Sequence, residues 1–280
     1  VMRALLALDM YEKTEEPIAQ AVGWALRMGA TLDLVTASEM LWNGNELFGS
    51  TENSALAIEW ERRSESLKRT LERRLPEIPE RIRGTARVIE GAAASALIDA
   101  SAGYDLIILS THGRKGLARL FAGSVAERVV RSVSCSVLIT RLDVARIPET
   151  GKLKVIFPID SNEPSVVGIR RARQILGTDY DFQAMCASPD MATLDEHPSI
   201  TFARERLGLA TTTGGLPDIP RVVRVGNGNP GEIIAAYAEE IGASLIAMPT
   251  HSRSLLGRLA YGSVAERVVR VAPCAVLITR

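Results

Sequence analysis

Short apolar runs alternate along the chain with longer segments in which apolar residues recur every three or four positions. Runs of the first kind are typical of buried strands, and the longer pattern is typical of amphipathic helices. In the first half, the pattern predicts strands at residues 3–10, 31–38, 85–91, 105–111 and 136–141. Helices are predicted between these strands at residues 14–28, 55–75, 92–101 and 124–131. Regular alternation of this kind predicts a parallel sheet with helices on both faces.

The second half follows the same order with a shorter middle. Strands are predicted at residues 154–160, 181–188 and 244–250, with a third strand and its turn at 221–230 and a last strand at 276–280. Helices are predicted at residues 164–176 and 231–240, with only a brief helix near Phe202 to Leu207.

One stretch of the first half returns almost unchanged at the end of the chain. Residues 110–141 read STHGRKGLARLFAGSVAERVVRSVSCSVLITR, and residues 249–280 read PTHSRSLLGRLAYGSVAERVVRVAPCAVLITR. Gly123 and Gly262 are 139 positions apart, which is about the length of one domain. We therefore predict two tandem domains, 1–146 and 147–280, with the polar segment 142–152 as the linker. Each is expected to be an open, parallel, five-stranded sheet flanked by helices, which is a Rossmann-like fold.

Residues 39–54 contain aromatic residues but no clear period. They are predicted to form a long loop or lid that could cover a pocket or a partner surface. The helix predicted after them, at residues 55–75, interleaves Glu and Arg, a pattern typical of a solvated surface.

Composition narrows the range of partners. The chain has 33 basic and 33 acidic residues and a sequence pI near 7.0, so no global positive field favours binding to nucleic acid or to an anionic membrane. No apolar run approaches the ~20 residues that span a bilayer, and the first residues do not resemble a signal peptide. We expect a cytoplasmic protein. Cys135, Cys186 and Cys274 form no CxxC pattern and are predicted to be buried thiols.

The repeated stretch follows a predicted central strand, at the sheet edge where α/β proteins bind ligands. Gly113 lacks a Cβ and permits close approach of an anion to the backbone, and Gly123 and Ser124 open a helix whose free N–H groups favour phosphate. Arg114, Lys115 and Arg119 add positive charge, and the hydroxyls of Ser110 and Thr111 add hydrogen-bonding groups. These residues predict a phosphate site. The alternative is purely structural, because Ser124-Val-Ala-Glu127 and Ser263-Val-Ala-Glu266 also fit capping boxes.

The whole stretch, from STHGRKG through GSVAERVV to CSVLIT, resembles the signature of the universal stress protein family, whose nucleotide-binding members carry G-x2-G-x9-G-[ST] here. The resemblance covers both halves and implies an adenine nucleotide alpha hydrolase-like fold that binds ATP, AMP or ADP, with Mg²⁺ as a further candidate. By position it assigns the adenosine end to Ala7, Leu8 and Asp9, and contact with the adenine to Ala37. It assigns the ribose and phosphates to a loop and helix start comprising Ser110, Thr111, His112, Gly113, Arg114, Gly123, Ser124 and Val125.

The same positions define a second candidate site in the second half, comprising Pro158, Ile159, Asp160, Pro249, Gly262, Ser263 and Val264. Relative to the family pattern, the first half departs once, with Ser110 in place of a glycine. The second half departs twice, with Pro249 and Ser252 in place of both loop glycines. We therefore expect nucleotide binding mainly in the first domain.

The resemblance implies a tandem universal stress protein that senses or regulates through nucleotide occupancy. Binding rather than turnover is expected, because no dedicated base or acid cluster stands near the phosphate loop. His112 and His251 are interpreted as loop residues. Slow ATP hydrolysis and a scaffold without a ligand stay open as alternatives. Family members commonly pair through their last strands, so Val137 to Thr140 and Val276 to Thr279 are expected to pair within the chain as an internal pseudo-dimer, and a homodimer is left open.

Overall fold

The computed structural model of the chain describes residues 1–10, 15–39, 50–111, 125–159, 163–188, 198–226, 228–249 and 262–280. In the first half the strands are β1 (Met2–Ala7), β2 (Ala30–Ser38), β3 (Arg83–Glu90), β4 (Leu106–Thr111) and β5 (Ser136–Arg141). The helices between them are α1 (Glu15–Met28), α2 (Ser50–Glu72), α3 (Ala93–Ala100) and α5 (Val125–Ser132). Two short 3-10 turns, Leu75–Glu77 and Glu80–Ile82, precede β3.

The second half has the strands β6 (Leu153–Pro158), β7 (Tyr180–Ser188), β8 (Arg221–Val225), β9 (Leu245–Pro249) and β10 (Ala275–Thr279). Its helices are α6 (Glu163–Leu176), α7 (Pro198–Thr213), α8 (Pro230–Ile241) and α9 (Ser263–Val271). The prediction of five parallel strands in each half is confirmed.

The ten strands form one continuous sheet in the order β3-β2-β1-β4-β5-β10-β9-β6-β7-β8. The two five-stranded parts meet at β5 and β10, the strands for which the sequence predicts pairing. They are antiparallel, with Ile139 opposite Val276, Leu138 opposite Leu277 and Val137 opposite Ile278. All six residues of β5 are buried, as expected of a strand with neighbours on both sides and helices above and below.

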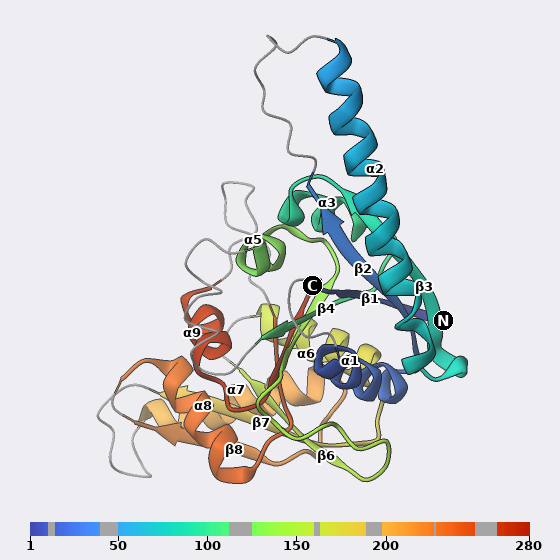
Figure 1. Cartoon of the computed structure of the whole chain (residues 1–280). Coiled ribbons are helices and arrows are strands. Elements are labelled where there is room, and N and C mark those ends of the chain that lie inside the picture. The colour runs from blue at the N-terminus through green and yellow to red at the C-terminus, as the bar shows by residue number, and fades with distance from the viewer. Residues whose placement is uncertain are drawn as a thin grey trace.

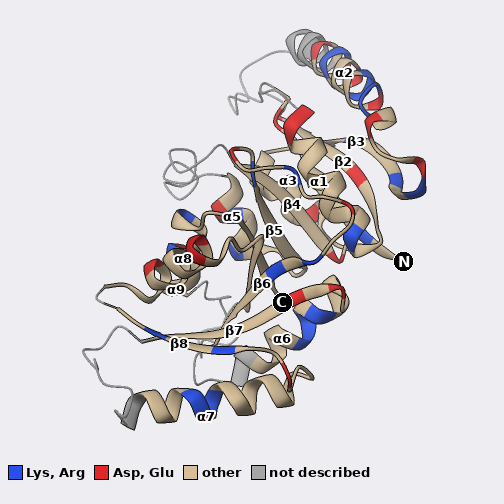
Figure 2. Ribbon diagram, turned by 90° about the horizontal axis from the view of Figure 1, so that it is seen from below, with Lys and Arg blue, Asp and Glu red and all other residues tan. Residues whose placement is uncertain are grey.

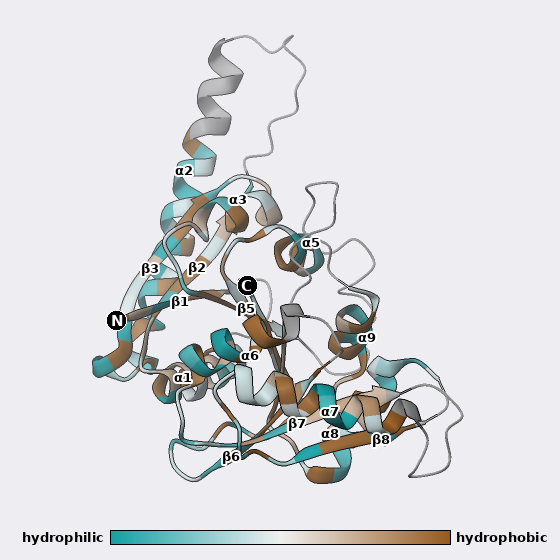
Figure 3. Cartoon of the chain, turned by 180° about the vertical axis from the view of Figure 1, so that it is seen from behind, coloured by the Kyte–Doolittle hydropathy of each residue, from teal (hydrophilic) through white to brown (hydrophobic). Residues whose placement is uncertain are grey.

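Helices cover both faces of the sheet (Figure 1). On one face, α1, α2, α6 and α7 contribute apolar side chains to a core that includes Trp24, Leu71, Ile169 and Leu207. On the other face, α3, α5, α8 and α9 contribute to a core that includes Leu97, Val129, Ile234 and Val268. Each core contains residues from both halves, so the two domains share their packing. The strands lie between the two helix layers, and the coloured part of α2 is mainly hydrophilic (Figure 3).

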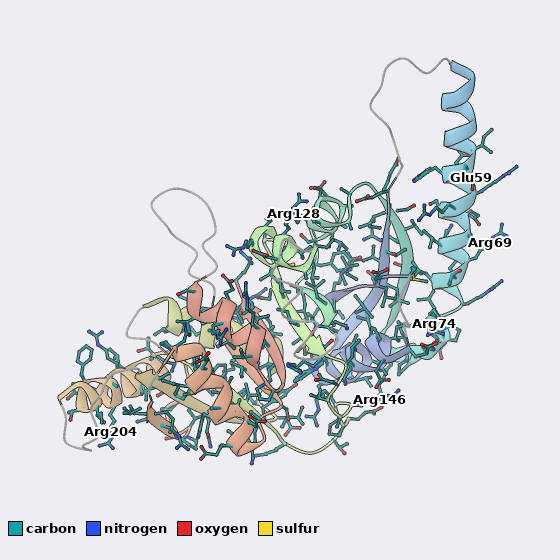
Figure 4. All side chains as sticks on the ribbon, turned by 60° about the vertical axis from the view of Figure 1, so that its left-hand side comes forward. Glu59, Arg69, Arg74, Arg128, Arg146 and Arg204 are labelled. Carbon is teal, nitrogen blue, oxygen red and sulfur yellow. The ribbon has the colours of Figure 1, made fainter. Side chains whose placement is uncertain are left out.

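Helix α2 differs from its prediction in its bounds. It begins at Ser50, inside the predicted loop 39–54, and ends at Glu72; residues 40–49 lie outside the described part of the chain. Along its described length it is mostly exposed and dense in charge (Figure 2). Leu71 is its fully buried anchor, and Arg69 pairs with Glu65 at 3.2 Å on the solvent side (Figure 4).

Helix α7 corrects the prediction of a brief helix at residues 202–207, because it runs for 16 residues. Its buried residues Ile200, Leu207 and Ala210 recur at helical spacing and join the sheet core or pack beside it. Tertiary packing therefore extends the helix through segments whose local sequence indicates loops.

The segment 142–152 has no helix or strand, but hydrogen bonds from side chains of α1 hold it in place. Arg27 of α1 donates from Nε to the Pro148 carbonyl at 2.7 Å and from Nη2 to the Gly151 carbonyl at 2.6 Å. Gln20 donates to the Val144 carbonyl at 3.0 Å. The predicted boundary between residues 146 and 147 falls within this segment.

Candidate nucleotide-binding site

In the first domain, the neighbouring parallel strands β1 and β4 send their chains to opposite faces of the sheet. Strand β1 lies between β2 and β4. The chain leaving β1 continues to α1 on one face, whereas the chain leaving β4 continues to α5 on the other. In open α/β sheets, this divergence leaves a crevice beyond the carboxyl ends of the strands, and ligands bind there.

Three predicted residues, Ala7, Leu8 and Asp9, lie at the end of β1. Leu8 is buried, and its N–H donates to the Val35 carbonyl of β2 at 2.8 Å, so the backbone keeps its course past the last strand residue. Asp9 is exposed at the rim of the crevice. Ala37 is half-buried near the end of β2, one strand away. The structure thus brings the residues assigned to the adenosine end to the same edge of the sheet.

The end of β4 supplies two hydroxyl groups to this edge. The Ser110 and Thr140 hydroxyl oxygens lie 2.8 Å apart and share a hydrogen bond. Thr111 is 2% exposed, and its Oγ1 has no hydrogen-bond partner within the part of the chain that the structure describes. An unsatisfied buried hydroxyl is uncommon, so the Thr111 hydroxyl is a group that a ligand could satisfy.

Several predicted residues of the phosphate loop, His112, Gly113, Arg114, Gly123 and Ser124, lie outside the described residues. Val125 is the first residue of α5 and is 41% exposed. The next turn of α5 is joined to α3, because Arg128 donates to Ser95 Oγ at 3.3 Å (Figure 4). The described residues therefore show that α5 begins on the side of the carboxyl end of β4.

In the second domain, helix α9 tests the capping-box interpretation of GSVAE. Gly262 is the N-cap and no side chain bonds to the cap, so Ser263 is the first residue inside the helix rather than its cap. Glu266 does not reach back either, because it pairs with Arg270 at 2.6 Å and with Arg131 at 3.4 Å. The capping-box alternative is wrong for this helix, and within the described part of the chain no side chain accepts from its first N–H groups at the cap.

The second domain repeats the crevice with one important difference. Ile159 donates its N–H to the Met185 carbonyl at 2.8 Å, as Leu8 does to Val35. Strand β9, however, ends in Pro249, and its ring packs against Gly168 of α6. A Cβ added to Gly168 would lie only 2.6 Å from Pro249 Cβ. Helix α6 therefore closes over the strand end where the first domain presents Ser110.

The rest of the second candidate site lies as follows. Pro158 is half-buried at the end of β6, Ser263 is exposed, and Val264 is half-buried on the first turn of α9. Asp160 lies outside the described residues, as do His251 and Ser252. Among the described residues, no group of three or more acidic, His or Cys side chains could hold a metal ion. None of the described helices is both long enough and apolar enough to cross a membrane.

Thr140 is a site neighbour that sequence reasoning missed, although it lies in the repeated stretch. Its register opposite Ser110 in β4 and β5 places the two hydroxyls together. The sequence signal was the threonine that follows the apolar residues VLI in VLITR, and it recurs as Thr279 in the second half.

The fold defines a tandem α/β protein, a class that binds ligands at the carboxyl ends of its strands. Comparison with known proteins identifies its family. The model of the universal stress protein family matches residues 1–141 and 153–280. The chain belongs to this family, with two such units in tandem.

Individual relatives agree with this assignment. A universal stress protein of Mycobacterium tuberculosis is 26% identical over 193 residues, which span 66% of this chain and 64% of the relative. The chain thus spans less than two thirds of that relative's length. A universal stress protein of Thermus aquaticus is 31% identical over 150 residues, covering 49% of this chain and 96% of the relative.

Solved structures agree in fold. The structure of a universal stress protein from Archaeoglobus fulgidus superposes with a TM-score of 0.69 at 20% identity, covering 99% of this chain and 98% of that one. A functionally unknown protein from Pseudomonas aeruginosa superposes with a TM-score of 0.62 at 18% identity, covering 100% and 92% of the two chains. These similarities extend over both halves.

Proposed function

We propose that this protein binds ATP, or the related nucleotides ADP and AMP, mainly in its first domain, and acts as a cytoplasmic stress sensor or regulator through nucleotide occupancy. The observation that carries the proposal is the divergence of the chain at the neighbouring ends of β1 and β4, to α1 on one face of the sheet and to α5 on the other. The carboxyl ends of parallel strands at such a point are where this class of fold binds nucleotides.

The described residues at the crevice fit an adenine nucleotide. Ala7, Leu8 and Ala37 offer small or apolar surface for a base, and Asp9 offers a carboxylate for ribose hydroxyls. The Thr111 hydroxyl, which has no partner among the described residues, offers a donor toward a phosphate oxygen. A bound ATP would also present its phosphates to Mg²⁺, which typically binds through nucleotide phosphates and water together with few protein ligands.

The proposal gives the second domain a weaker site. Pro249 lacks an N–H for a ligand, and its ring fills the space beside Gly168. Binding rather than turnover is the proposed activity, because the described residues at these strand ends of the first domain supply the Asp9 carboxylate and several hydroxyls but no acid–base pair.

The test is calorimetric titration of the purified protein with ATP, together with mass analysis of nucleotide that survives purification. We expect ATP binding, and Thr111→Val should weaken it about tenfold or more, because a hydrogen bond to a charged oxygen contributes roughly 1.5–3 kcal/mol. Thr31→Val is the matched control, since Thr31 lies at the opposite end of β2 from the crevice. Absence of binding together with no retained nucleotide would favour a scaffold, and steady phosphate release would favour an ATPase.

A further inference from the structure

An arginine at the end of the last strand of each domain donates a hydrogen bond to a helix of the other domain. The arginine after β10 bonds to α5, and the arginine that ends β5 bonds to the end of α9. Arg141, the last residue of β5, donates from Nη1 to the Ala272 carbonyl at the end of α9 at 2.5 Å. Arg280, which follows β10, donates from Nη2 to the Val130 carbonyl in the last turn of α5. The two contacts link residues 131 and 150 positions apart. The two helices lie side by side on one face of the sheet in two different views (Figures 1 and 2).

Both arginines are placed where a helix favours positive charge. The last carbonyls of a helix lack intrahelical partners, and the helix dipole makes this end partially negative. Arg141 is 4% exposed, and it also forms two hydrogen bonds with Asp143, at 2.9 and 2.5 Å. Burial lowers the pKa of Arg280. These cations lie in the interior of the junction between domains, where a hydrogen bond to a carbonyl is stronger than at the surface.

A third contact joins the same helices. Arg131 of α5 approaches Glu266 of α9, with Nη2 3.4 Å from Oε2, while Glu266 also pairs with Arg270 on its own helix. The side chains Val129 and Val130 of α5 share one apolar core with Val268 of α9. The two helices are therefore joined by an ion pair and lie over the same apolar core.

The family resemblance assigns the phosphates to the starts of these two helices, at Ser124 and Val125 for α5 and at Ser263 and Val264 for α9. Helix α5 has eight residues and α9 has nine, so each is only about 12–14 Å long. A short helix moves as a rigid body, and a shift at its last turn changes the position of its first N–H groups. The other domain contacts the C-terminal end of each helix, and this contact thus determines the position of the helix's N-terminal end, which is the end assigned to the ligand.

We propose that Arg280 and Arg141 are positioning residues that act across the domain boundary, each orienting the nucleotide-facing helix of the opposite domain. The inference rests on the proposed nucleotide function. It adds that the second domain, although its own site is weak, positions a helix of the site in the first domain. Because both domains belong to one chain, the domain that supplies each arginine is always attached to the helix that it positions.

Amide hydrogen exchange of the protein without nucleotide tests the positioning itself. Arg280→Gln should speed exchange in α5, which lies in the other domain, by about three- to tenfold and leave α9 unchanged. Arg141→Gln is the matched variant, and it should speed exchange in α9 and leave α5 unchanged. An effect confined to the domain that carries the substitution, or no effect in either helix, would overturn the inference.

Titration then tests the consequence for binding, with ATP and adenosine as paired probes. Arg280→Gln should weaken ATP binding about three- to tenfold and leave adenosine binding unchanged, because adenosine has no phosphates to meet α5. Arg280→Lys should restore part of the ATP affinity. Equal losses for ATP and adenosine, or unchanged ATP binding, would contradict a positioning role. If the unsubstituted protein binds no ATP, the proposed function fails, whereas the exchange pattern still decides whether the arginines hold the helices.

Discussion

Asp33 occupies an unusual environment for a carboxylate, because its side chain is only 4% exposed in the middle of β2. Tyr104 donates its hydroxyl to Oδ2 at 2.6 Å, and the Thr85 N–H donates to Oδ1 at 2.6 Å. Arg3 adds a charged donor at 2.9 Å and stacks over the Tyr104 ring. Burial raises the pKa of Asp33, but the hydrogen bonds from these three partners outweigh burial and lower it overall.

Because its folded-state pKa is lowered, ionised Asp33 stabilises the fold at pH values above its unfolded-state pKa of about 3.9. This contribution is lost as the pH falls through the folded-state pKa. We expect Asp33→Asn to lower the free energy of unfolding by about 2 kcal/mol at pH 7 and by less in strongly acidic solution. Urea unfolding at several pH values measures both. Exposed Asp218→Asn is the control, and an equal loss at all pH values would contradict the assignment.

The three thiols should differ in reactivity because they differ in burial. Burial raises the pKa of Cys274 to about 12 and also raises that of Cys135, whereas Cys186 is half-buried. Since the thiolate is the reactive form, we expect a thiol-specific reagent at pH 8 to modify at most Cys186 in the folded protein. All three should react after denaturation. Rapid labelling of Cys274 in the folded state would show that β10 opens readily.

Among the elements, α6 and β9 make the closest backbone approach near the second crevice. A Cβ on Gly168 would lie 2.6 Å from Pro249 Cβ and 2.9 Å from its Cγ. Gly168→Ala should therefore push α6 from the strand and lower the free energy of unfolding by about 1–3 kcal/mol. Gly208→Ala in α7 is the matched control, because its nearest neighbour would be Arg221 Nη1 at 3.6 Å. Alanine favours helix over glycine by up to about 1 kcal/mol, so this control should unfold at the same or a higher temperature.

The elements also show how far local sequence predicts this fold. The strands of both halves were predicted from the sequence. The central strands β4 and β9 were predicted from almost wholly apolar runs, as expected of buried parallel strands, whereas the edge strands β3 and β8 carry polar residues and are exposed or half-buried. The ends of α2 and the length of α7 were predicted wrongly. In α7, the threonines and Gly208 lower helix propensity, and the burial of Leu207 and Ala210 against the sheet overrides it. The capping-box pattern at α9 matched in sequence, but both of its side chains point elsewhere in the folded chain.

At the scale of the whole molecule, the strand-end residues of the candidate site were predictable, since strand order determines which carboxyl ends diverge. The packing of Pro249 on Gly168 and the hydrogen bonds that the two arginines donate across the domain boundary were not. These contacts join residues far apart in sequence, and their geometry depends on the junction of β5 and β10. The sequence ITR occurs at residues 139–141 and again at 278–280, and this repeat does not indicate to which helix each arginine donates its hydrogen bond.

The duplicated chain should bind nucleotide unequally in its two halves. The first half keeps Gly113, whereas the second has Pro249 and Ser252 at the glycine positions of the family pattern. Gly113 and Ser252 lie outside the described residues, so their effect is argued from residue type: glycine permits a backbone approach that a Cβ obstructs, and proline cannot donate. Losing one or two hydrogen bonds to phosphate, at roughly 1.5–3 kcal/mol each, weakens affinity about tenfold to several thousandfold.

Calorimetric titration should therefore find one tight ATP site per chain. Gly113→Val should abolish it, because the new side chain occupies the space that a phosphate needs. Ser252→Val is the matched change in the other half and should alter binding little, since Pro249 and α6 already close the end of β9. Two sites of equal affinity would contradict this inequality, as would tight binding that survives Gly113→Val. If the tight site disappears only with Ser252→Val, nucleotide binding belongs to the second half, and the end of β6 at Pro158 and Ile159 becomes the place where the base must lie.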